Sequence, residues 1–133
     1  MSYAALADRA RSAYQTNQLQ MEDPVGLVVR LYDGMLSFLR RGAELLQARQ
    51  MAPASEQIRR ATDIVGELQA VLNLREGGEV AFNLDRLYSY CRRRIMESHL
   101  QADPAGLMEV ARLMTPLRDA WAEARVKQAG LPR

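Results

Sequence analysis

The sequence predicts an all-α fold, an antiparallel four-helix bundle with a short N-terminal helix or mobile arm. Three observations lead to this prediction: helix start signals, short breaks between long segments, and apolar residues at helical spacing. The start signals are Asp23-Pro24 and Asp103-Pro104, because Asp can accept from free amides and Pro suits the first helical position. Breaks fall at residues 51–55 and at Gly77-Gly78. Helices of about 20 residues joined by such short turns bury their apolar faces best as an antiparallel bundle.

The first predicted helix, about residues 24–49, has an apolar arc of about 200°, roughly twice what a surface helix needs. Its central stripe is widened to one side by Leu27, Leu31 and Phe38. Two interpretations account for this width and do not exclude each other. Either the helix is central and contacts more than one neighbour, or part of the arc faces a groove for another chain's helix.

The other three helices are expected at about residues 55–74, 80–101 and 104–128, each with apolar residues at i, i+3 and i+4 intervals. Ser55 is a candidate cap for the second of them. Thr115-Pro116 falls inside the last helix, where Pro removes an amide and clashes with the preceding turn. We expect a kink there, or a restart with Thr115 as the cap. The resulting division is an arm over residues 1–22, a bundle over 23–128 and a disordered tail over 129–133.

Composition argues against chemistry at a metal or catalytic centre. Among 133 residues there is one cysteine, Cys91, and one histidine, His99. A buried free cysteine is an ordinary core residue, and His99 with Asp103 at i+4 has neither a nucleophile nor a second ligand beside it. We therefore expect no catalytic residues, no metal site and no cofactor.

Charge and hydropathy argue against a nucleic-acid-binding or a membrane-spanning protein. The net charge of +2 is small, and the run Arg92-Arg93-Arg94 is spread around a helix instead of forming one patch, so nucleic-acid binding is not expected. No stretch approaches the roughly 18 apolar residues that span a bilayer, and the first residues lack a secretory pattern. We expect a cytoplasmic protein with no membrane insertion.

Several motifs, in order along about residues 10–125, are similar to those of one known family. They are Ala13-Tyr14-Gln15-Thr16-Asn17, Asp23–Val28, Leu31-Tyr32-Asp33-Gly34, Leu72-Asn73, Gly77–Leu84, Leu87–Tyr90 and Leu117–Trp121. Each motif alone is weak, but their order and spacing are specific. The chain resembles the FliS family of flagellar export chaperones.

The resemblance implies a cytoplasmic helical bundle without enzymatic activity. Its implied partners are the C-terminal segment of flagellin, which becomes helical as it wraps around the bundle, and the export gate protein of the flagellar type III secretion apparatus. Binding would prevent premature polymerisation of flagellin and help deliver it for export. A weak homodimer is an additional open possibility.

Five residues are the candidates for partner binding. Leu27, Leu31 and Phe38 come from the wide apolar arc of the first helix. Tyr14 and Asn17 lie in the arm, and the resemblance implies that the arm can occupy part of the flagellin site. The alternative function is a generic helical adaptor or oligomeric scaffold, which would self-associate through the same apolar strip.

Overall fold

The computed structural model describes residues 23–128 and contains four helices. They are α2 (Pro24–Gln47), α3 (Met51–Ala70), α4 (Gly78–Gln101) and α5 (Ala105–Gln128). The arm over residues 1–22, with the candidates Tyr14 and Asn17, and the tail over 129–133 lie outside the described residues. None of the four helices is long and apolar enough to cross a membrane.

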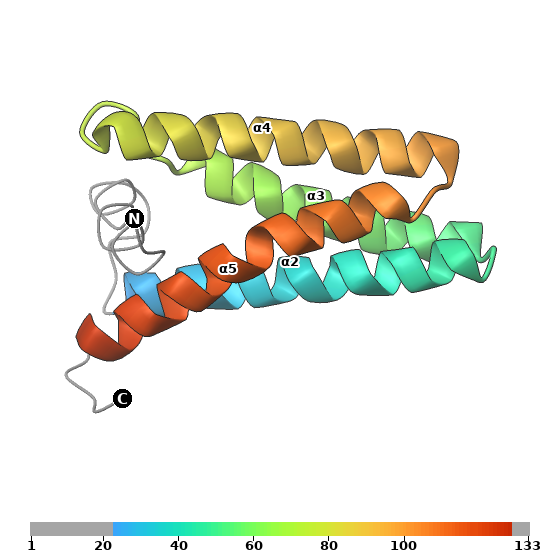
Figure 1. Ribbon diagram of the computed structural model, residues 1–133, viewed down its shortest axis with the longest axis horizontal. Coiled ribbons are helices and arrows are strands. Elements are labelled where there is room, and N and C mark those ends of the chain that lie inside the picture. The colour runs from blue at the N-terminus through green and yellow to red at the C-terminus, as the bar shows by residue number, and fades with distance from the viewer. Residues whose placement is uncertain (1–22, 129–133) are drawn as a thin grey trace.

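The four helices form the predicted antiparallel bundle. Figure 1 shows α2 and α4 running in one direction and α3 and α5 in the other. Each helix packs on its two neighbours in the ring α2–α3–α4–α5, and the packing is closest around α2. The interpretation of the first helix as a central one is therefore confirmed, because contacts with both α3 and α5 use most of its wide apolar arc.

The start of α2 follows the prediction from Asp23-Pro24. The Asp23 carboxylate accepts from the Gly26 amide at 2.9 Å, and Pro24 occupies the first turn. The other carboxylate oxygen of Asp23 accepts from Arg125 Nε at 3.0 Å, so the cap also joins the start of α2 to the end of α5. The Gly26 amide and the Arg125 guanidinium hold the pKa of Asp23 below its usual value.

The break predicted at residues 51–55 is wrong, because α3 already begins at Met51. Pro53 sits in the first turn of the helix, where a missing amide costs no hydrogen bond. The chain turns earlier, at Arg49, whose φ is 61°. Ser55 is not a cap, since its hydroxyl lies 2.8 Å from His99 Nε2.

The other two turns follow the sequence more closely. Gly78 has a φ of 61°, a conformation that suits glycine, and the Asn73 side chain accepts from the Glu76 amide at 3.0 Å. At the second turn, Ala102 is left-handed and Asp103 Oδ1 accepts from the Ala105 amide at 3.0 Å. The start predicted at Asp103-Pro104 is confirmed within one residue.

Helix α5 runs without interruption through Pro116, so the predicted restart at Thr115 is wrong. The Thr115 hydroxyl does not cap a new helix. It donates to the Ala111 carbonyl at 2.7 Å, one turn earlier. Threonine commonly bonds back in this way inside helices, which explains why a cap-forming residue type can sit here without ending the helix.

The core is mostly aliphatic, as the low aromatic content of 6% requires. Its two tyrosines form a pair across the bundle: the Tyr32 and Tyr88 hydroxyls lie 2.7 Å apart and both residues are 0% exposed. Burial raises the pKa of Tyr32 to about 12, while hydrogen bonds with Tyr88 and Trp121 act in the opposite sense. The largest side chains in the core, each under 2% exposed or nearly so, include Trp121, Tyr32, Tyr88, Met35, Leu39, Leu68 and Ile95.

We predict that Tyr32→Phe lowers the free energy of unfolding by about 1–2 kcal/mol, because it leaves the buried Tyr88 hydroxyl without this partner. Tyr88→Phe has a similar cost for the same reason. The double variant costs clearly less than the sum, since the bond between the two hydroxyls can be lost only once. Urea unfolding of the four proteins measures the cycle, and additive costs would contradict the role of the pair.

We also predict a loss of stability in acid to which Asp23 contributes. Its pKa is lowered on folding, so its contribution is full above the unfolded value of about 4 and disappears as pH falls through the folded pKa. Asp23→Asn keeps an acceptor for Gly26 but removes the titration, and it should flatten the decline of the thermal midpoint between about pH 5 and 2. Glu67→Gln, exposed on α3, is the control, and an equal flattening there would refute the assignment.

Candidate partner-binding surface

Leu27, Leu31 and Phe38, here called the α2 strip, lie half-buried against the core on one side of α2. Gly34 lies in the same row, and a Cβ at this position would come within 3.3 Å of Ile64 Cδ1 on α3. The Arg60 guanidinium of α3 lies 5.8 Å from the centre of the Phe38 ring. The strip therefore follows the outer junction of α2 with α3, with an arginine at its edge.

A larger apolar hollow, of about 800 Å³, lies between the first half of α3 and the second half of α4. We call it the α3–α4 groove. Ile58 and Ile95 lie at its base and are 3% and 1% exposed, whereas Met96 is 57% exposed. The Thr62 hydroxyl in this groove donates to the Ile58 carbonyl at 2.9 Å, so this donor is already satisfied within α3.

The two walls of the α3–α4 groove differ in charge. On α3, Arg59 is paired with Glu56 at 2.7 Å and with Asp63 at 3.0 Å. Hydrogen bonds from Arg59 and Arg60 lower the pKa of Glu56 to about 2. The charges of the α3 wall are thus largely compensated within the helix.

The α4 wall carries Arg92 and Arg93, for which no carboxylate partner is seen within residues 23–128. Arg93 lies over the Tyr90 ring at 5.5 Å from its centre. His99 ends this wall and is bonded to Ser55 across the groove, instead of to Asp103 as its spacing would allow. The α4 wall is consequently the positive one.

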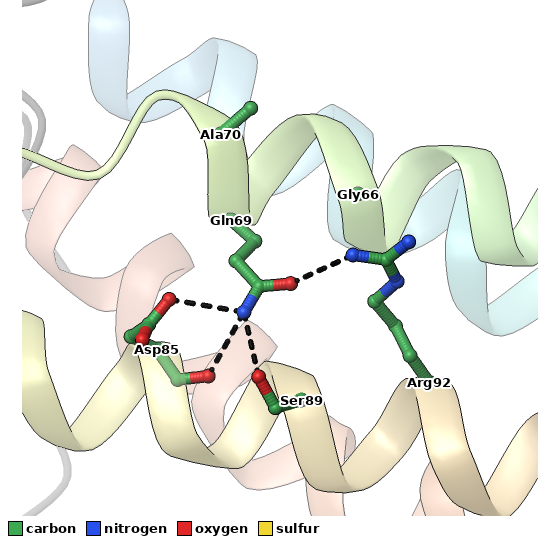
Figure 2. Close-up of a pocket in the computed structure, with 6 residues that line it drawn as sticks. All are labelled: Gly66, Gln69, Ala70, Asp85, Ser89 and Arg92. Carbon is green, nitrogen blue, oxygen red and sulfur yellow. Dashed lines mark hydrogen bonds between the residues drawn. The ribbon is translucent and has the colours of Figure 1, made fainter.

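A second pocket, of about 430 Å³, continues the junction of α3 and α4 beyond Arg92. Figure 2 shows the Gln69 side chain reaching from α3 toward Asp85, Ser89 and Arg92 of α4 within this pocket. Its amide nitrogen lies 2.9 Å from Asp85 Oδ1 and 2.8 Å from Ser89 Oγ, and its oxygen accepts from Arg92 at 3.1 Å. These bonds form a polar clasp between the two helices, here called the Gln69 clasp.

The Cys91 thiol and the Glu109 carboxylate have structural roles in the bundle. Burial raises the pKa of Cys91 to about 12, so the thiol stays protonated and is a poor nucleophile. Glu109 joins α5 to α4 by accepting from Arg94 at 2.9 Å and from the Tyr90 hydroxyl. Over residues 23–128, no group of three or more His, Cys, Asp or Glu side chains is placed to hold a metal ion.

Sequence reasoning missed the α3–α4 groove. The apolar stripe of the third predicted helix contains Leu84, Leu87, Tyr88, Cys91 and Ile95, and Met96 and Leu100 fall outside it. These two are one turn apart and are 57% and 79% exposed. Met96, a large apolar residue that lines the groove outside the core stripe, was the available signal.

Comparison with known proteins identifies the family. The family model described as "Flagellar protein FliS" matches residues 7–128. The chain is 32% identical over 113 residues to the flagellar secretion chaperone FliS of Bacillus subtilis, covering 85% of this chain and 84% of that protein. It is 32% identical over 105 residues to the Salmonella typhimurium chaperone, with 78% of each chain covered. It is 30% identical over 119 residues to flagellar secretion chaperone FliSB of Pseudomonas aeruginosa, covering 86% of this chain and 94% of that one.

These matches confirm the resemblance found in the motifs and the prediction of a chaperone that is not an enzyme. They extend over almost all of the bundle, so the four helices and the surfaces described above belong to the matched region. The chain therefore belongs to the FliS family of flagellar secretion chaperones.

Proposed function

We propose that this chaperone binds the C-terminal segment of flagellin in the cytoplasm, prevents its premature polymerisation and delivers it to the export gate protein of the flagellar type III apparatus. The observation that carries the proposal is membership of the FliS family over most of the chain. The α2 strip supports it, because half-buried leucines beside an arginine suit an amphipathic segment.

The mechanism follows from the physics of coupled folding and binding. A disordered apolar segment exposes the surface through which it would assemble. Covering that surface on the bundle removes it from assembly, while the entropy lost on ordering keeps the complex reversible. Reversibility matters for an export chaperone because the client must be released at the apparatus.

Within this proposal, Leu27, Leu31 and Phe38 contact the client, and Tyr14 and Asn17 belong to a segment that covers the same surface when no client is bound. The Arg60 guanidinium at the edge of the strip would fix the orientation of the bound flagellin segment more than it would raise the binding affinity. The active species is one chaperone with one flagellin. A weak homodimer would then compete with the client for the strip, and an oligomeric scaffold is the alternative.

We predict that the chaperone and full-length flagellin form a one-to-one complex that is lost when the C-terminal segment of flagellin is deleted. Size-exclusion chromatography with light scattering measures both the complex and the free chaperone. A complex that survives the deletion would refute the proposed client segment. A stable oligomer of the free chaperone that does not dissociate with flagellin would favour the scaffold.

We further predict that Leu27→Ala combined with Leu31→Ala weakens flagellin binding at least about tenfold, because central apolar anchors dominate such interfaces. Leu113→Ala is the matched control, since Leu113 is a partly exposed leucine on α5. Calorimetric titration gives the affinities, and circular dichroism shows that each variant is folded. If the double variant and the control weakened binding equally, the α2 strip would not be the binding site.

A further inference from the structure

The sulfur-containing side chains among residues 23–128 differ widely in exposure. Met35, Met114 and Cys91 are each 0% exposed, whereas Met96 on α4 is 57% exposed. Burial also raises the pKa of Cys91 to about 12, so its thiol stays protonated and is a weak nucleophile. A thioether has no proton to lose, and its susceptibility to oxidants follows its exposure. Met96 is therefore the residue whose sulfur an oxidant in solution reaches most readily in this part of the chain.

Met96 stands in apolar surroundings with a cation close by. It lines the α3–α4 groove together with Ile58 and Ile95, so its side chain forms part of that apolar surface. Arg92 lines the same groove one helical turn earlier on α4, a spacing that brings side chains together on one face. The bond from Arg92 to Gln69 Oε1, at 3.1 Å, occupies one of the five guanidinium donors. A positive charge with further donors is thus placed one turn from the thioether.

The other two exposed methionines of the described range lie in different settings. Met108, 37% exposed, lines a pocket of about 520 Å³ between α2 and α5, where the carboxylates of Glu44 and Asp103 accompany a single arginine. Two carboxylates disfavour negative charge forming on a departing oxygen. Met51, 42% exposed, is the first residue of α3 and does not line the groove. Within residues 23–128, only Met96 combines high exposure, a nearby cation and an apolar groove.

We propose that Met96 is a reversible oxidation site, at which a peroxide converts the thioether to the sulfoxide and makes the α3–α4 groove polar while the bundle stays folded. A lone pair on sulfur attacks one peroxide oxygen, so the S–O bond forms as the O–O bond breaks. Sulfur loses two electrons and the peroxide gains them. The departing hydroxide removes the proton from the transferred oxygen and leaves as water. The Arg92 guanidinium stabilises the departing hydroxide and then donates to the sulfoxide oxygen.

The position of Met96 separates this modification from unfolding. Met96 lies outside the stripe through which α4 enters the core, which contains Tyr88, Cys91 and Ile95. A sulfoxide at an exposed position leaves those contacts intact, whereas oxidation of a buried methionine would place a polar group in the core. The site is also separate from the α2 strip, so it can be tested in the free chaperone without flagellin.

Peptide mass spectrometry of the full chain, treated with hydrogen peroxide, measures the oxidation rate at each methionine. Within residues 23–128, Met96 should be oxidised at least about threefold faster than Met108, because its sulfur is more exposed and its neighbour is cationic. Met35 and Met114 should stay unmodified as long as the chain is folded.

Two arginine variants test the role of the neighbouring charge. Arg92→Gln should slow the oxidation of Met96 about twofold at low salt, because it removes the cation from the groove. Arg86→Gln, also exposed on α4 but outside the groove, should leave that rate unchanged. Equal slowing in the two variants would contradict the role of Arg92.

The polarity of the groove is measured with the dye anilinonaphthalene sulfonate, whose aromatic rings suit Ile58 and Ile95 and whose sulfonate suits Arg92. Peroxide should weaken dye binding by the wild-type chain at least about threefold, and methionine sulfoxide reductases of both stereospecificities should restore it. Met96→Leu keeps an apolar side chain of similar volume and should bind the dye equally before and after peroxide. Met108→Leu is the matched control and should respond as the wild-type chain does.

The proposal is wrong if Met96 is oxidised no faster than Met108, or if Met96→Leu loses dye binding with peroxide as the wild-type chain does. It is also wrong if the oxidised wild-type chain melts more than about 5 °C below the reduced one, since the modification would then disrupt the bundle. Thermal unfolding of each variant before treatment verifies that it is folded.

Discussion

The hydrogen bond between Tyr32 and Tyr88 joins α2 to α4 through the centre of this bundle. The two residues belong to helices that lie diagonally across the ring and pack little on each other directly, so this buried bond is the main polar link across the core. In a core of mostly aliphatic side chains, this bond adds a directional contact to the close packing of the helices. Helix α4 also has polar contacts with its lateral neighbours: His99 with Ser55, Ser89 with Gln69, and Arg94 with Glu109.

This arrangement explains where the surface is hollow. Helix α2 packs closely on both neighbours, partly because Gly34 and Gly42 let side chains of α3 approach its backbone. Helix α4 is joined to α3 by polar contacts that span the junction, and the groove lies between the two helices. The surface of the bundle is hollowed between α3 and α4, and a smaller pocket of about 520 Å³ lies where Ala43 and Gln47 of α2 meet Ala105 and Met108 of α5.

The sequence specified the helices well and the surfaces poorly, for physical reasons that differ. Asp23-Pro24 acts locally, through a side chain and an amide three residues away, so it is readable from a few letters. The break at Pro53 and the restart at Thr115-Pro116 were wrong because the effect of proline depends on its position within a helix, which is not fixed until the helix start is known. Exposure is harder still. Leu31 and Met96 are both large and apolar, and only the packing of neighbouring helices leaves the first half-buried and the second mostly exposed.

The Gln69 clasp marks the end of the apolar groove along the junction of α3 with α4. A chain lying along the groove meets open apolar surface as far as Arg92, and then a set of hydrogen bonds that already satisfy both helices. Extending further would require those bonds to be exchanged for others, with no gain in buried apolar area because the second pocket is lined mainly by polar side chains. The apolar part of this face of the bundle therefore has a defined end, at Arg92 and the Gln69 clasp.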